Sequence, residues 1–169
     1  MLDQIRVSVI IPCFNEELYI ENCINSILKQ DFNIDQTEII VVDGNSNDKT
    51  LELLKKYARI KIFDNPKQIV PISMNIGIKN ATGDFIIRID CHCIYPQNYI
   101  SELIKNAIKY NADNIGTIMH TIPANESTKA KVIAIAISHP LGVGNSYFRI
   151  GSNEVREVDT VPFGCYKKE

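Results

Sequence analysis

Five side chains that could bind a ligand follow three short apolar runs of this chain. Phe14 and Glu16 follow the first run, Asp43 follows the second, and Asp90 and His92 follow the fourth. An aromatic ring can lie against a flat base, and the first two carboxylates can accept hydrogen bonds from its N–H groups. Asp90 suits a hard divalent cation, with His92 as a second ligand, because such ions take one or two protein carboxylates and phosphate oxygens. Together these groups predict a site for a nucleoside diphosphate leaving group.

Each of these residues also has a purely structural explanation. An acid after a strand is often a turn or helix-capping residue, and Asp48 is one example. Phe14 could be an ordinary core side chain, and Glu16 could compensate the positive end of a helix dipole. The imidazole of His92 could be satisfied by structural hydrogen bonds. Their common position after successive strands favours the shared site.

The elements that must position these side chains alternate along the first 110 residues. Short apolar runs rich in β-branched residues predict strands at 7–11, 38–42, 60–63 and 85–89. Stretches of helical periodicity follow each run, and Asn15 can cap the first helix. This order predicts an α/β fold with a mostly parallel sheet and helices on both faces. Ligands of such sheets bind outside the carboxyl ends of the strands, so the polar segments should converge.

After residue 112 the pattern is weaker. We expect four further elements: a strand within 115–120, a helix at 129–138, a Gly-rich loop at 140–153 that is mobile or covers a ligand, and a strand at 158–166. Pro162 would lie near the edge of that last strand, because proline lacks an N–H group for the ladder.

Composition excludes several classes of protein. The chain has 169 residues, 45% of them apolar, 22% charged and a net charge of −2, which is typical of a globular protein and gives no support for nucleic-acid binding. No apolar run approaches the roughly 20 residues of a membrane span. Neither a GxGxxG segment after the first strand nor a GxxxxGK[ST] segment occurs, which argues against an NAD(P) enzyme and a P-loop NTPase.

The five cysteines predict reduced thiols in a cytosolic protein. Their number is odd, no CxxC pair occurs, and no secretory signal is expected at the start of the chain. The Cys91-His92-Cys93 segment does not favour a zinc site, because neighbouring side chains of an extended segment point to opposite faces.

Three segments together resemble the signature of the family 2 inverting glycosyltransferases, which have the GT-A fold. They are Val7–Glu16, Ile40–Thr50, and Met74–Gly77 followed by Ala81–Ile87. The resemblance implies a nucleoside pocket. The residues that it assigns to this pocket are Pro12, Phe14, Asn15, Glu16, Asp43 and Asn75.

The resemblance also implies a divalent metal, Mn²⁺ or Mg²⁺. Asp90 would be the first position of the Asp-x-Asp metal motif, but the third position is His92 instead of aspartate. A histidine ligand favours softer ions than Mg²⁺. The segment 88–92 and the tail 158–169 resemble a subset of this family, the ExoA-like bacterial exopolysaccharide transferases of succinoglycan synthesis.

The implied activity is transfer of a sugar from a nucleotide-diphosphate sugar, most often a UDP-sugar, to a saccharide or lipid-linked acceptor with inversion. The product would be a cell-surface polysaccharide or exopolysaccharide. Inversion requires a general base for the acceptor hydroxyl, and the family places it in an acidic motif that we expect beyond Glu169. Residues 1–112 would be the nucleotide-sugar-binding half and residues 113–169 the start of an acceptor-side half. We therefore expect a truncated chain that binds nucleotide without transferring sugar. We expect it in the cytoplasm, with the inner face of the plasma membrane as the place where lipid-linked acceptors would be met.

Two other functions remain open at this point. A sugar-activating nucleotidyltransferase would need a Gly-rich, Arg-containing loop after its first strand, and segment 12–16 lacks one. A non-catalytic receiver-like module would use Asp43 as its phosphorylation site, but it would need more acids near the first strand and a lysine after the last.

Overall fold

The computed structural model describes residues 4–168, which divide into two compact units. The first unit runs through Ile115 and also includes the chain from Cys165 onward, and the second is Gly116–Gly164. Within the described residues, no helix has both the length and the apolar character needed to cross a membrane. The division by function at residue 112 stays a prediction, because compactness says nothing about what each part binds.

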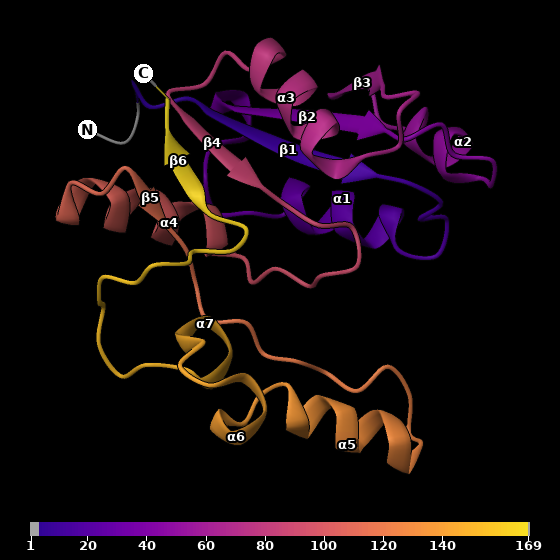
Figure 1. The fold of residues 1–169 in the computed structure, drawn as a ribbon. Helices are drawn as coiled ribbons and strands as arrows, with labels where there is room; N and C mark the ends of the chain where they lie inside the picture. The colour runs from indigo at the N-terminus through magenta and orange to yellow at the C-terminus, as the bar shows by residue number, and fades with distance from the viewer. Residues whose placement is uncertain (1–3, 169) are drawn as a thin grey trace. The chain divides into compact units, whose positions relative to one another are not determined.

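The first unit is built on a six-stranded sheet with the order β3-β2-β1-β4-β6-β5 (Figure 1). Its strands are β1 (Val7–Cys13), β2 (Thr37–Asp43), β3 (Ile60–Asp64), β4 (Phe85–Arg88), β5 (Asn114–Ile115) and β6 (Cys165–Lys167). The first four strands pair in parallel, whereas β6 runs antiparallel to β4 and β5. The predicted α/β fold with a mostly parallel sheet is confirmed. Because β2 and β4 flank β1 on opposite sides, the winding of the chain reverses between β1 and β4, which is where such sheets bind ligands.

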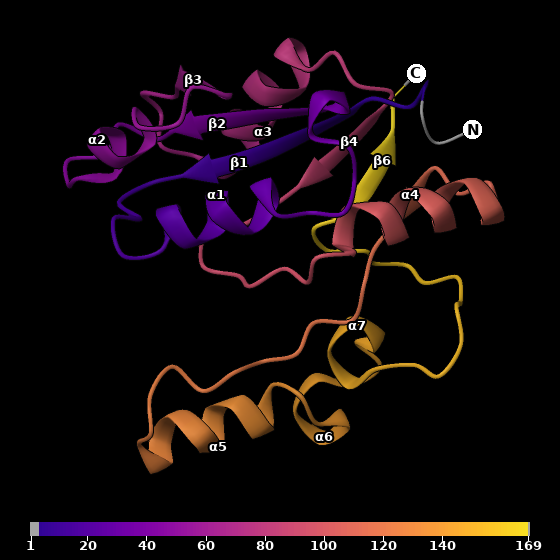
Figure 2. The same ribbon diagram turned by 180° about the vertical axis from the view of Figure 1, so that it is seen from behind.

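Helices cover both faces of this sheet, as predicted (Figure 2). The larger core cluster joins one face to α1 (Ile20–Leu28), α2 (Thr50–Leu54) and α4 (Tyr99–Tyr110). The smaller cluster joins the other face to α3 (Val70–Asn80). A short 3-10 helix, η2 (Ile34–Gln36), precedes β2. The central strand β1 is buried on both faces, which explains why its sequence is a continuous apolar run.

Two glycines allow other segments to approach β1 closely. A Cβ atom on Gly77 of α3 would lie 2.4 Å from Cγ2 of Ile10, and a Cβ atom on Gly83 would lie 2.6 Å from the backbone nitrogen of Ser8. The hydroxyl of Ser8 accepts a hydrogen bond from the backbone N–H of Gly83 (2.9 Å) and donates one to Glu38 (2.6 Å). Packing on β1 therefore explains the glycines of the third sequence segment.

The second unit contains three helices, α5 (Thr128–Ala136), α6 (Pro140–Val143) and α7 (Tyr147–Ile150). Helix α5 confirms the helix predicted at 129–138. The prediction of a loop at 140–153 was wrong in part, because two short helices form there. Pro140 has the fixed φ of a first helical residue, and Nδ1 of His139 accepts a hydrogen bond from the N–H of Leu141. Gly144 and Gly151, both with positive φ, end these two helices.

The two strands expected late in the chain are much shorter than predicted. Only Cys165–Lys167 of the tail is a strand, and β5 covers only Asn114–Ile115. Pro162 cannot donate a ladder hydrogen bond, and Phe163 has a φ of +50°, which an extended strand does not allow. The chain therefore becomes extended only after this residue.

Candidate functional site

A pocket of about 140 Å³ lies in the first unit at the carboxyl ends of β1 and β4. Its lining includes Pro12, Phe14 and Glu16 from the first strand and its loop, and Asp90 and His92 from the loop after β4. The structure therefore brings the first predicted loop and the predicted metal ligands to one place. This place is the point in the sheet where the winding of the chain reverses.

The loop after β1 is held by hydrogen bonds from the loop after β2. Oδ1 of Asn15 accepts from the N–H of Asn47 (2.9 Å), and the hydroxyl of Ser46 accepts from the N–H of Asn15 (2.9 Å). The hydroxyl of Thr50 accepts from the N–H of Glu16 (2.8 Å). The polar residues of the second sequence segment thus position the first segment.

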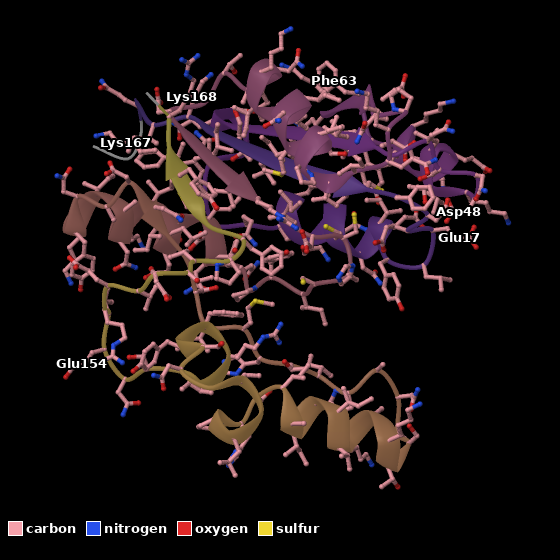
Figure 3. The ribbon with its side chains drawn as sticks, in the orientation of Figure 1. Glu17, Asp48, Phe63, Glu154, Lys167 and Lys168 are labelled. Carbon is pink, nitrogen blue, oxygen red and sulfur yellow. The ribbon has the colours of Figure 1, made fainter. Side chains whose placement is uncertain are left out.

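Glu17 and Asp48 join the same two loops, and their side chains are neighbours in Figure 3. Asp48 accepts from the N–H of Glu17 (3.1 Å), while Glu17 accepts from the N–H of Lys49 (3.1 Å). Asp48 also accepts from the N–H of Thr50 (2.9 Å), the first residue of α2, although the N-cap position of this helix is Lys49. Desolvation would raise the pKa of Asp48, but the hydrogen bonds from Thr50 and Glu17 outweigh it and lower the pKa below its ordinary value.

Asn15 does not cap α1, so that prediction was wrong. Its φ is +54°, in the left-handed region that asparagine tolerates, and α1 begins only at Ile20. The turn between them is closed by the carbonyl of Glu16, which accepts from the N–H groups of Tyr19 and Ile20 (2.9 Å each). The side chain of Asn15 accepts a hydrogen bond from the neighbouring loop instead of capping the helix.

Three residues that the resemblance assigned to the nucleoside pocket lie outside its lining: Asn15, Asp43 and Asn75. Asp43 is 1% exposed, and its two carboxylate oxygens accept from the N–H (2.9 Å) and the hydroxyl (2.6 Å) of Ser46. Asn75 is exposed on α3. The structure thus shows Asp43 organising the loop after β2, and contact of any of the three residues with a nucleoside stays a prediction.

The segment after β3 also contributes to the pocket, although the residues predicted for the site did not include it. Gln68, Val70 and Ser73 line the pocket, and Gln68 has a φ of +56°. The segment is organised by Asn65, which is fully buried and donates to the carbonyl of Ile69 (3.0 Å) and the hydroxyl of Ser73 (2.9 Å). The Asn-Pro pair directly after the third strand is a turn signal that could have identified this segment.

Two contacts between side chains line the pocket on its β4 side. Nε of Arg88 lies 3.1 Å from Oδ1 of Asp90, and Nδ1 of His92 lies 3.3 Å from Oε1 of Glu16. The hydroxyl of Tyr95 accepts from the N–H of Asp90 (2.9 Å) and donates to its carbonyl (3.2 Å). Tyr95 therefore holds the backbone of Asp90, the predicted metal ligand, and Arg88 holds its carboxylate.

The side chains of this pocket fit a divalent ion that takes few protein ligands. The side chains of Asp90 and Glu16 are 15% and 19% exposed, and that of His92 is 60% exposed. Across residues 4–168 there is no preformed group of three or more His, Cys, Asp or Glu side chains placed to hold a metal. An ion that serves a diphosphate needs only one or two protein ligands, because phosphate and water supply the others.

The thiols beside the pocket are held in their neutral form. Burial, together with Cys13, Cys93 and nearby carboxylates, raises the pKa of Cys23 to about 12. A hydrogen bond with Cys13 and burial raise the pKa of Cys91, and burial raises that of Cys93. Because the thiolate is the nucleophilic form of cysteine, this environment makes these thiols poor nucleophiles.

Curated proteins similar to this chain are glycosyltransferases. A dolichyl N-acetyl-alpha-D-glucosaminyl phosphate 3-beta-D-2,3-diacetamido-2,3-dideoxy-beta-D-glucuronosyltransferase of Methanococcus voltae is 33% identical over 171 residues, covering 95% of this chain and 52% of that protein. The succinoglycan biosynthesis protein ExoA of Rhizobium meliloti is 33% identical over 150 residues, covering 85% and 44%. The chain thus spans about half the length of these relatives.

Solved structures with the same fold include two transferases in complex with nucleotide sugars. TarS residues 1–349 of S. aureus, in complex with UDP-GlcNAc, matches 72% of this chain and 36% of its own, with a TM-score of 0.63 and 26% identity. The mannosyltransferase PcManGT of Pyrobaculum calidifontis, in complex with GDP-Man and Mn²⁺, matches 68% and 35%, with a TM-score of 0.59 and 25% identity. The predicted GT-A type of α/β fold is confirmed.

The sequence model of one family matches nearly the whole chain. Glycosyl transferase family 2 matches residues 8–166, which include the three segments that carried the resemblance. That resemblance, including the likeness to ExoA, is confirmed. The chain therefore belongs to glycosyl transferase family 2.

Proposed function

We propose that this protein binds a nucleotide-diphosphate sugar, with UDP as the nucleotide, in the pocket between β1 and β4. The sugar would pass with inversion to a saccharide or lipid-linked acceptor. The observation that carries this proposal is the convergence of Phe14, Asp90 and Arg88 in one pocket at the point where the sheet reverses its winding. The complex of TarS with UDP-GlcNAc supports the choice of nucleotide.

Phe14 is the residue that we assign to the base. Its side chain is 45% exposed and so is not a core side chain. Its ring offers a flat apolar surface against which a base can stack. Since Asp90 and His92 line the same pocket from the β4 side, a base on Phe14 would direct its diphosphate toward them.

Asp90 and His92 are the residues that we assign to a divalent ion, Mn²⁺ in preference to Mg²⁺ because one ligand is an imidazole. When bound, the ion would neutralise the charge of the departing diphosphate. The Mn²⁺ in the complex of PcManGT supports this assignment. Tyr95 contacts the backbone of Asp90, and Arg88 pairs with its carboxylate.

The acceptor and the general base are assigned by class only. The name of the Methanococcus voltae relative, which acts on a dolichyl phosphate saccharide, supports a lipid-linked acceptor. Cytoplasmic action at the inner face of the plasma membrane belongs to the same proposal. No pocket residue is assigned as the base, and its position beyond Glu169 stays a prediction.

The two alternative functions have lost their support. The chain belongs to a glycosyl transferase family, whereas a nucleotidyltransferase would need a loop that segment 12–16 does not have. A receiver would need an accessible Asp43, but this residue is 1% exposed and its carboxylate is bound by Ser46.

Thermal unfolding with nucleotide and metal tests the proposal. At a UDP concentration 100 times its Kd, with Mn²⁺ present, binding adds about 2.7 kcal/mol to the free energy of unfolding, which is about 5–10 °C in Tm for a chain of this size. We expect Asp90→Asn to abolish the Mn²⁺-dependent part of this shift and to retain the shift caused by uridine. Asp35→Asn, which changes an exposed carboxylate of η2, is the matched control. If UDP at millimolar concentration leaves the Tm of the unaltered protein unchanged with Mn²⁺ present, the proposal is wrong.

A further inference from the structure

The charges that line the pocket do not by themselves favour a diphosphate. Glu16 and Asp90 contribute two carboxylates. Among the described residues that form the lining, Arg88 supplies the one lysine or arginine side chain. With His92 neutral, the formal charge of the lining is −1, whereas a nucleoside diphosphate is itself strongly negative. Cationic groups must therefore contact the phosphates when the nucleotide binds.

Arg88 is placed so that it can reach either of two partners. It is the last residue of β4 and shares a face of that strand with Ile86, which belongs to the core cluster under α3. Its side chain is 30% exposed, and its Nε contacts Oδ1 of Asp90 at 3.1 Å. A guanidinium carries five N–H donors, so one arginine side chain can serve more than one acceptor. A planar guanidinium is also well suited to bind phosphate through paired hydrogen bonds.

The partner that Arg88 holds is also the residue that we assign to the metal. A divalent ion at Asp90 would bring a second cation to the carboxylate that the guanidinium already neutralises. Since like charges repel, the ion would weaken the attraction between the guanidinium and this carboxylate. A diphosphate offers the guanidinium a new anionic partner close by.

We propose that Arg88 exchanges partners: it neutralises Asp90 while the pocket is empty, and it turns to the diphosphate when Asp90 takes the metal. This inference rests on the proposed nucleotide site. Arg88 would then be a substrate-binding residue that also competes with the metal. Its two roles have opposite effects on metal affinity and on nucleotide affinity, which makes them separable by experiment.

Replacement of Arg88 by glutamine tests the exchange through binding alone. We expect Arg88→Gln to bind Mn²⁺ about 3- to 10-fold more tightly without nucleotide, because the competing cation is gone, as measured by the electron paramagnetic resonance signal of free Mn²⁺. We expect its Kd for UDP at saturating Mn²⁺ to rise at least 10-fold, as measured by calorimetry, because a charge-assisted contact is lost. Uridine, which has no phosphate, should bind with unchanged affinity.

A second variant and a control make the outcome decisive. Arg88→Lys keeps the positive charge but lacks the planar guanidinium. We therefore expect its Mn²⁺ affinity to be near that of the unaltered protein and its UDP binding to be weaker. This variant is used for the test if Arg88→Gln does not fold. Arg59→Gln removes a guanidinium from a surface pair with Asp35 (2.9 Å) and should change neither affinity.

The results distinguish this inference from the proposed function. If Arg88 only orients Asp90, Arg88→Gln will bind Mn²⁺ more weakly, and the exchange is refuted. It is also refuted if UDP affinity is unchanged in Arg88→Gln while the unaltered protein binds UDP. If the unaltered protein binds neither UDP nor uridine, the proposed function itself fails.

Discussion

Replacing Gly77 with alanine tests how closely α3 must pack on the central strand. The added Cβ atom would lie 2.4 Å from Cγ2 and 3.0 Å from Cδ1 of Ile10. Ordinary contact begins near 3.4 Å, so the helix or the side chain has to move by about 1 Å. Ile10 is fully buried between its neighbours in the sheet and the helix and cannot move outward. We therefore expect α3 to shift away from β1.

The cost of this shift can be estimated from known effects. Overpacking a core typically costs about 1–3 kcal/mol, and the upper part of that range applies because the obstructing side chain is β-branched and fully buried. Part of this loss is offset, because alanine in a helix is about 1 kcal/mol more stabilising than glycine. The expected net loss is therefore about 2 kcal/mol in the free energy of unfolding. For a chain of this size that is about 4–8 °C in Tm.

The same shift should weaken nucleotide binding. Ser73 lies one helical turn before Gly77 on the same face of α3, and it lines the pocket. Movement of α3 away from β1 would carry this side chain out of place. We expect calorimetry to give a higher Kd for UDP in Gly77→Ala. Lys79→Ala, at an exposed position of the same helix, is the matched control and should change neither quantity.

A double replacement separates steric overlap from a loss of flexibility. Ile10→Ala alone should cost about 2–5 kcal/mol by leaving a cavity. If steric overlap is the cause, the methyl group that Gly77→Ala adds fills part of this cavity, and the double variant is less destabilised than the sum of the single variants. Additive effects, or a Gly77→Ala protein as stable as the unaltered one, would refute the reasoning.

Two further predictions concern acid stability and base stacking. Burial would raise the pKa of Glu38, but hydrogen bonds from Lys61, Ser8 and Thr82 outweigh it and lower the pKa. The stability that this carboxylate contributes is therefore present above its unfolded pKa of about 4.3 and is lost as pH falls through the lower folded value. Glu38→Gln should lower the free energy of unfolding at pH 7 by about 2 kcal/mol. Its Tm should also fall less steeply than that of the unaltered protein as the pH is lowered. If the Tm falls with pH as steeply as in the unaltered protein, the prediction is contradicted. Phe14→Ala should weaken uridine and UDP equally, by about 5-fold or more, with little change in Tm; a loss for UDP alone would assign Phe14 to the phosphates.

Much of the fold could be predicted because its signals are local. Runs of β-branched apolar residues predict buried strands, and a helical segment between two such runs predicts that the two strands are parallel. The late part of the chain was predicted less well, because its short helices depend on Pro140 and on two glycines with positive φ more than on periodicity. The shortened last strand likewise follows from Pro162 and Phe163.

Local sequence patterns are enough to place Phe14, Glu16, Asp90 and His92 at the ends of strands, and hence together at one edge of the sheet. Which side chains enter the pocket there depends on contacts that form only in the folded chain. Asp43 turns away to Ser46, whereas Arg88, which no sequence motif marked as a binding residue, enters the lining. Side-chain direction at a strand end depends on hydrogen bonds between loops about 30 residues apart, such as those from Asn47 to Asn15 and from Glu16 to Thr50. No local pattern of residues specifies such pairings.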